Sequence, residues 1–128
     1  MRYPDDKIMA EMMNRHYVMC RLRDLKSTFE QTIPVDLDDQ ESLYRLVRSE
    51  RPALVLELGG GFSTFTIASA LQTNGRGMVV SVDDSHVWQR NTQSYFKAYP
   101  DLARRVHFVQ SMLVPWSSKY EWGDHIEY

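Results

Sequence analysis

The sequence has a single cysteine, Cys20, and no long run of apolar residues. One cysteine excludes an internal disulfide. A membrane-spanning helix needs about eighteen consecutive apolar residues, and the sequence predicts none. The first residues are charged and interrupted, which is not typical of a secretory signal peptide. Together these absences predict a cytoplasmic protein.

Neither sign of charge is in large excess. Fifteen Lys and Arg against seventeen Asp and Glu leave a net charge of −2. This balance does not favour nucleic acid or an anionic membrane as a partner. Hydrophobic residues make up 43% and charged residues 25% of the 128 residues. That composition excludes a disordered or low-complexity chain and fits about one globular domain.

Residues 1–51 are predicted to form an amino-terminal helical cap. Apolar residues recur there at steps of three and four, first at Met9, Met13, Tyr17 and Cys20. This is the period of a helix. Met is adaptable at binding surfaces, so this stripe is a candidate for docking a partner. We favour the more common arrangement, in which an amphipathic helix packs on the rest of its chain or on a second copy. A second helix is expected after Asp38 or Asp39, with Pro52 ending it.

Residues 52–128 have a different pattern. Short apolar runs at 53–58, 78–82 and 106–109 alternate with segments of helical length at 64–72 and 87–99. Strands that alternate with helices at this spacing predict a parallel sheet with crossover helices. The nearly continuous apolar strands are typical of a sheet that is covered on both faces. The predicted fold class is therefore α/β.

A run of three glycines follows the first predicted strand. Gly59, Gly60 and Gly61 stand between that strand and the next helix, where glycine permits a tight turn and close approach of a ligand. Asp83 ends the second strand, and a carboxylate there can accept hydrogen bonds from ribose hydroxyls. Both features belong at the carboxyl edge of the sheet, where such folds bind ligands. The pattern predicts a nucleoside-binding site. The alternative is a tight turn and a helix-capping aspartate with no ligand.

Two classes of nucleoside-binding protein share this architecture. The dinucleotide fingerprint G-x-G-x-x-G/A is met by Gly59 and Gly61, but Thr64 stands where a small residue is expected. A nicotinamide-dependent oxidoreductase fragment is therefore disfavoured. The stretch VLELGGGFSTFTIASAL instead resembles the first motif of class I S-adenosylmethionine-dependent methyltransferases. VVSVDDS resembles their second motif, and VHFVQSML resembles their third strand and its exit.

The resemblance implies a Rossmann-like domain that binds S-adenosylmethionine and releases S-adenosylhomocysteine (SAH). It places Glu57 at the base of the glycine loop, Asp83 on the ribose hydroxyls and Ser111 beside the adenine. The implied cofactor-binding residues are Glu57, Gly59, Gly60, Gly61, Ser63, Asp83, Asp84, Ser111 and Met112. The implied activity is methyl transfer to an acceptor that the sequence does not identify. The catalytic residues stay unassigned. His86 is the histidine nearest the predicted site, and no metal site is predicted.

The predicted sheet is shorter than that of the family it resembles. Residues 53–128 hold about two and a half strand–helix–strand units of roughly 30 residues each. A complete methyltransferase sheet has seven strands, which needs roughly 200 residues at that rate. We therefore expect a partial sheet of three to four strands, apparently truncated after the third. A homo-oligomer or a missing carboxyl half would complete it. A non-catalytic module that binds the cofactor or a protein partner is the alternative function.

Overall fold

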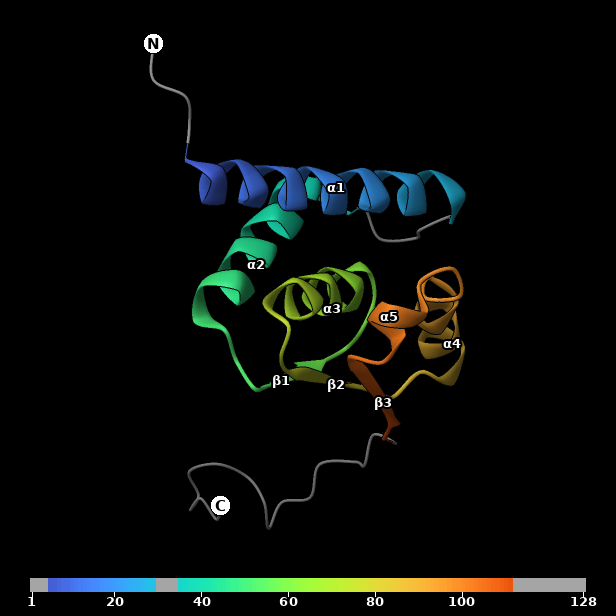
Figure 1. Cartoon of the computed structure of the whole chain (residues 1–128). Coiled ribbons are helices and arrows are strands. Elements are labelled where there is room, and N and C mark those ends of the chain that lie inside the picture. Colours follow the sequence, from blue (N-terminus) through green and yellow to red (C-terminus); the bar gives the residue numbers. More distant parts are fainter. Residues whose placement is uncertain (1–4, 30–34, 112–128) are drawn as a thin grey trace, which may run out of the picture.

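The computed structural model describes residues 5–29 and 35–111. Figure 1 shows α1 lying across the top of the molecule, with α2 and α3 between it and the strands. The elements follow in the order α1 (Asp6–Thr28), α2 (Leu37–Glu50), β1 (Leu54–Leu58), α3 (Phe62–Asn74), β2 (Met78–Asp83), α4 (His86–Ser94), α5 (Pro100–Ala103) and β3 (Val106–Gln110). None of the helices within these ranges is both long and apolar enough to cross a bilayer.

The three strands form one parallel sheet in the order β1-β2-β3. Leu54 of β1 lies opposite Met78 of β2, and Val79 of β2 lies opposite Val106 of β3. Parallel neighbours need crossover connections, which α3 supplies between β1 and β2, and α4 with α5 between β2 and β3. The result is a partial, Rossmann-like α/β fold preceded by two helices, which confirms the predicted fold class.

The helix after β2 is shorter than the sequence pattern predicts. A single helix is expected over residues 87–99, but α4 ends at Ser94 and the chain turns before α5 begins at Pro100. A proline disfavours helical backbone in the residue before it. Tyr99 accordingly has φ −133° and ψ 67°, and Pro100 takes the first position of α5, where its missing N–H costs nothing.

The caps of the two amino-terminal helices are aspartates. Asp5 is the N-cap of α1, and its side chain accepts a hydrogen bond from the Lys7 backbone N–H at 2.7 Å. The cap of α2 is Asp36, whereas Asp38 or Asp39 was expected. Both of those residues lie in the first turn of α2, where a carboxylate also interacts favourably with the helix dipole.

The core lies between α3 and its neighbours. Helix α3 is buried on nearly all sides because the sheet covers one side and α2 the other. Arg48 of α2 ties three helices together by donating to Glu11 of α1 and to Asn74 of α3. The hydrogen bond to Glu11 raises the pKa of Arg48, and burial raises the pKa of the Tyr44 phenol. The buried apolar side chains of the core include Leu22, Leu25, Tyr44, Val47, Phe65, Ile67, Leu71, Val79, Tyr95 and Phe96.

The methionine stripe on α1 was predicted to pack on the rest of the chain or on a second copy. The first of these arrangements is wrong for the described residues. Met9, Met13 and Tyr17 are exposed, with 45%, 67% and 59% of their surface accessible. The face that packs on α2 and α3 instead carries Val18 and Leu22, together with Met19 and Leu25. Helix α1 therefore has two apolar faces, and one of them is left at the surface.

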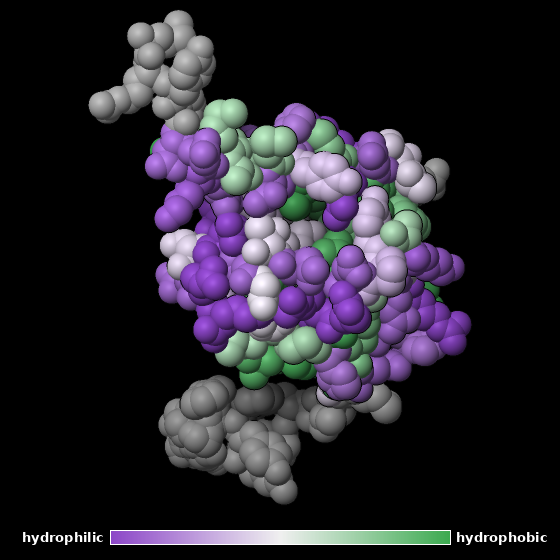
Figure 2. Space-filling model, in the orientation of Figure 1, coloured by the Kyte–Doolittle hydropathy of each residue, from purple (hydrophilic) through white to green (hydrophobic). Residues whose placement is uncertain are grey.

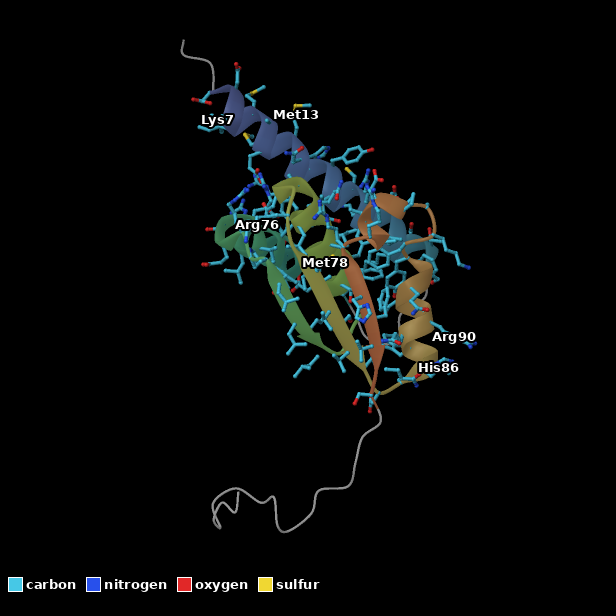
Figure 3. The ribbon with its side chains drawn as sticks, turned by 60° about the horizontal axis from the view of Figure 1, so that its bottom comes forward. Lys7, Met13, Arg76, Met78, His86 and Arg90 are labelled. Atoms are coloured by element: carbon cyan, nitrogen blue, oxygen red, sulfur yellow. The ribbon has the colours of Figure 1, made fainter. Side chains whose placement is uncertain are left out.

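Only one face of the sheet is covered by the described residues. Leu54, Leu56 and Leu58 of β1 alternate along the strand and are 64%, 64% and 79% exposed, beside Met78 of β2. Val79, on the opposite face, is fully buried. Figure 3 shows Met78 on the open face, and Figure 2 shows apolar residues at that lower edge. The expectation of a sheet covered on both faces is not met within the described ranges.

The open face gives a first testable prediction. Leu56→Lys is expected to change the free energy of unfolding by less than about 1 kcal/mol, because its side chain is largely solvated already. It should also reduce self-association and dye binding to apolar surface. Leu71→Lys, at a fully buried position, is the matched control and is expected to unfold the protein. Urea denaturation compares the two variants. An equal loss of stability in both would show that the β1 face is covered.

Candidate cofactor site at the glycine turn

The glycine turn and the ends of β2 and β3 meet at one edge of the sheet. The Gly59 N–H donates to the Val82 carbonyl at 2.7 Å, which continues the parallel ladder into the turn. The Ser111 N–H donates to the Asp83 carbonyl at 3.0 Å on the other side of β2. Parallel strands bring their carboxyl ends together, and this edge is where open α/β sheets bind ligands. The structure therefore brings the predicted residues from three strands together at one edge.

Glu57 is the central side chain beneath the turn. It is 8% exposed, and its carboxylate accepts hydrogen bonds from three hydroxyl groups. Ser63 donates at 2.5 Å, Ser81 of β2 donates at 2.8 Å, and Thr64 donates as well. A buried carboxylate is costly unless donors surround it, and these three donors satisfy it. Glu57 thereby joins the end of β1, the first turn of α3 and the middle of β2.

Gly59 and Gly60 are required for different reasons. Gly59 has φ +86°, which residues with a side chain rarely adopt, and a Cβ there would meet open space. At Gly60 a Cβ would lie 2.8 Å from the Ser81 hydroxyl oxygen and 3.0 Å from that of Thr64. Gly60 is therefore small because it packs on the hydroxyl groups around Glu57. Gly59, and Gly61 whose Cβ direction is also open, leave the outer surface of the turn bare.

Asp83 links the turn to the next helix. One carboxylate oxygen accepts from the Gly60 N–H at 3.2 Å, and the other accepts from the Ser85 N–H at 2.9 Å. The side chain is 7% exposed. Each carboxylate oxygen has a second lone pair, so these bonds leave acceptor capacity for a ligand hydroxyl. The neighbouring Asp84 is exposed.

Trp88 contacts the turn, which sequence reasoning missed. Its indole N–H donates to the Gly60 carbonyl at 3.0 Å. Tyr95, seven residues further along the chain, lies beyond the end of α4 and packs edge-on against Phe62. The available signal was its position: Trp88 lies in the first turn of the helix that begins at this edge, so its side chain reaches back toward the glycines.

The exit of β3 is held by side chains of α4. Gln89 donates to the Val109 carbonyl at 2.8 Å, and His86 Nδ1 lies 3.0 Å from Gln110 Oε1. Ser111 is exposed at this edge. Met112 lies outside the described residues. Figure 3 shows His86 and Arg90 on α4, at the same end as the exit of β3. The edge therefore offers an acidic group, bare glycine backbone and the amino ends of α3 and α4, where backbone N–H groups can receive polar ligand atoms.

Residues 5–29 and 35–111 contain no cluster of side chains that could bind a metal ion. No group of three His, Cys, Asp or Glu side chains there is arranged to hold an ion. The acidic groups of the site are engaged instead with hydroxyl and backbone donors. The acidic and histidine residues near the carboxyl end, Asp124, His125 and Glu127, lie outside these ranges.

The chain is similar in fold to a solved methyltransferase structure. The SAH-bound methyltransferase PaMTH1 of Podospora anserina has a TM-score of 0.58 to this chain at 14% sequence identity. The likeness covers 87% of this chain and 52% of that one, so the chain spans about half the length of the structure it matches. No family model and no curated protein matches the sequence. The comparisons thus support a methyltransferase-like fold.

Proposed function

We propose that this protein binds S-adenosylmethionine and belongs to the class I methyltransferases. One observation carries the proposal: the Asp83 carboxylate is hydrogen-bonded to the Gly60 N–H. That contact sets an acid at the end of β2 against a glycine turn at the end of β1, in a fold that is similar to an SAH-bound methyltransferase. The same acid is the ribose-binding residue that the sequence resemblance implies.

The residues at this edge fit a nucleoside with an attached amino acid. Asp83 has free lone pairs for ribose hydroxyls, and Gly59 with Gly61 leaves backbone open to close approach. The Glu57 carboxylate already accepts from the hydroxyl groups of Ser63, Thr64 and Ser81, so its role is to hold the turn. Ser111 and Asp84 are exposed on either side of Asp83. We assign them to the border of the adenine and ribose.

S-adenosylmethionine, when bound, supplies a methyl group on a positively charged sulfur. The chain's own contribution is position and electrostatics. Asp83 orients the ribose, the glycine turn receives the amino-acid part, and the carboxylates at the edge favour a cation. The methyl acceptor and any general base stay unassigned. His86 is held by Gln110 at the rim of the site, and its role in catalysis is not part of the proposal.

We also propose that the acceptor side is completed by further protein. The chain spans 52% of the compared methyltransferase, and the β1 face is open. A second copy of the chain or a carboxyl half would cover this face. An apolar parallel sheet is stable when both faces are covered. A binding module without methyl transfer is the alternative, because the described residues show no acceptor site.

Calorimetric titration tests the proposed function. The purified chain is titrated in parallel with S-adenosylmethionine, SAH and NAD. We expect binding of the first two and none of NAD, because Thr64 fills the helix–strand contact where dinucleotide-binding turns have a smaller residue. Transfer of a tritiated methyl group to a panel of acceptors then separates an enzyme from a binding module. Binding of NAD alone, or of none of the three, would overturn the proposal.

A further inference from the structure

The outward face of α1 carries an apolar seam with a regular spacing. Met9, Met13, His16 and Cys20 follow one another at steps of four, three and four residues. This is the a/d spacing by which one helix packs along another. Met9 and Met13 are 45% and 67% exposed, and Figure 3 shows Met13 pointing away from the body of the protein. His16 is exposed as well, and Cys20 is half-buried.

Opposite charges stand at the two ends of the seam. Asp6 continues it at the amino end and Arg23 at the carboxyl end, three residues beyond Met9 and Cys20 respectively, and both are exposed. Of the other charged residues of α1, Glu11 and Arg15 are already paired with Arg48 and Glu41 of α2. A seam with an acidic and a basic end is complementary to itself when a second copy runs in the opposite direction.

We propose that the α1 seam binds the α1 seam of a second copy, antiparallel, around a twofold axis. One register satisfies every layer, and antiparallel packing pairs an a position with a d position in each. Met13 meets the second copy's His16, and Met9 meets the second copy's Cys20. At both ends Asp6 meets the second copy's Arg23. In a twofold interface each of these contacts occurs twice.

The features of the seam favour this occupant over an unrelated partner. Its acidic and basic ends match each other in sign and in spacing, a property that a surface evolved for a different protein does not need. The seam from Asp6 to Arg23 is about 26 Å long at the rise of a helix, enough for a short helix pair. Flexible methionine side chains suit close packing between two copies. Figure 2 shows apolar side chains at the surface over α1, at the top of the molecule.

Cysteine cross-linking tests the register in the full chain. Met9→Cys places a thiol beside the native Cys20 of the second copy, so mild oxidation should give a covalent dimer on a non-reducing gel. The unsubstituted protein is the matched control. Its two Cys20 thiols are about 16 Å apart in the antiparallel register, beyond disulfide reach. Efficient cross-linking of the unsubstituted protein would show a parallel pair and overturn the proposal.

Charge exchange tests the same register without relying on oxidation. Asp6→Arg and Arg23→Asp are each expected to weaken dimerisation about fivefold in sedimentation equilibrium, and the double variant should recover it. Both positions are exposed, so each substitution is expected to cost less than about 1 kcal/mol of folding stability, including the loss of the Asp6 charge in the first turn of α1. Met13→Lys should weaken dimerisation about fiftyfold, because the substitution buries an ammonium group beside the second copy's His16 in both central layers. These measurements are made in the Leu56→Lys background, so that association through the sheet face does not contribute. The proposal would be overturned if the Leu56→Lys protein were monomeric at high concentration. It would also be overturned if the double variant dimerised no better than the two single variants. Its failure leaves cofactor binding untouched.

Discussion

Asp83→Asn is expected to weaken S-adenosylmethionine binding about 100-fold in calorimetric titration. The Asp83 carboxylate accepts hydrogen bonds from the Gly60 and Ser85 N–H groups. In the proposed site its remaining lone pairs accept hydrogen bonds from the ribose hydroxyls. The amide side chain keeps the shape but replaces one acceptor oxygen with a donor. A hydrogen bond to a charged acceptor contributes about 1.5–3 kcal/mol, and losing one of them gives an effect of about this size.

The neighbouring acid is the matched control. Asp84→Asn removes the same charge one residue away, where the side chain is exposed and no hydrogen bond holds the turn. We expect its effect on affinity to be less than about fivefold, because a solvated carboxylate at the border of the site contributes at most about 1 kcal/mol. Titrations are made at a temperature where circular dichroism shows both variants folded, since Asp83→Asn also loosens the turn. Unchanged affinity in Asp83→Asn would refute the ribose assignment. Equal losses in both variants would indicate an effect of charge alone.

Glu57→Ala is expected to lower the free energy of unfolding by about 3 kcal/mol. The substitution removes the shared acceptor of three hydroxyl groups, two of which belong to the fully buried Thr64 and Ser81. Leaving buried donors without an acceptor costs about 1–3 kcal/mol for each group, and partial rearrangement of the hydroxyls reduces the sum. Urea denaturation monitored by tryptophan fluorescence measures the loss.

A double-substitution cycle shows whether the contact itself carries the effect. Ser81→Ala in the Glu57→Ala background should cost at least 1 kcal/mol less than Ser81→Ala alone, because its partner is already gone. Glu50→Ala, at the exposed end of α2, controls for removal of a negative charge and should change stability by less than about 0.5 kcal/mol. Additive costs in the cycle would mean that Glu57 and Ser81 act independently.

The amino-acid pattern was sufficient to predict that the sheet has three parallel strands. Apolar runs bounded by Pro52, the glycine turn and Gly77 determined three parallel strands, because a short buried strand and a crossover helix leave local signatures in sequence. The motif around Gly59 and the acid at Asp83 likewise predicted that the two would meet, since parallel strands share a carboxyl edge. The division of the chain at residues 51 and 52 into two domains stays a prediction.

Tertiary structure decided what local patterns do not encode. Periodicity identified α1 as amphipathic, but only packing selected Val18 and Leu22 for the core and left Met13 outside, because both faces of that helix are apolar. The indole of Trp88 reaches the Gly60 carbonyl from another element, a contact that depends on how α4 is set against the sheet. The sequence by itself determined the strands, the turn and the acid that could bind a nucleoside. The fold decided which surfaces remain open, because burial depends on which elements meet in space.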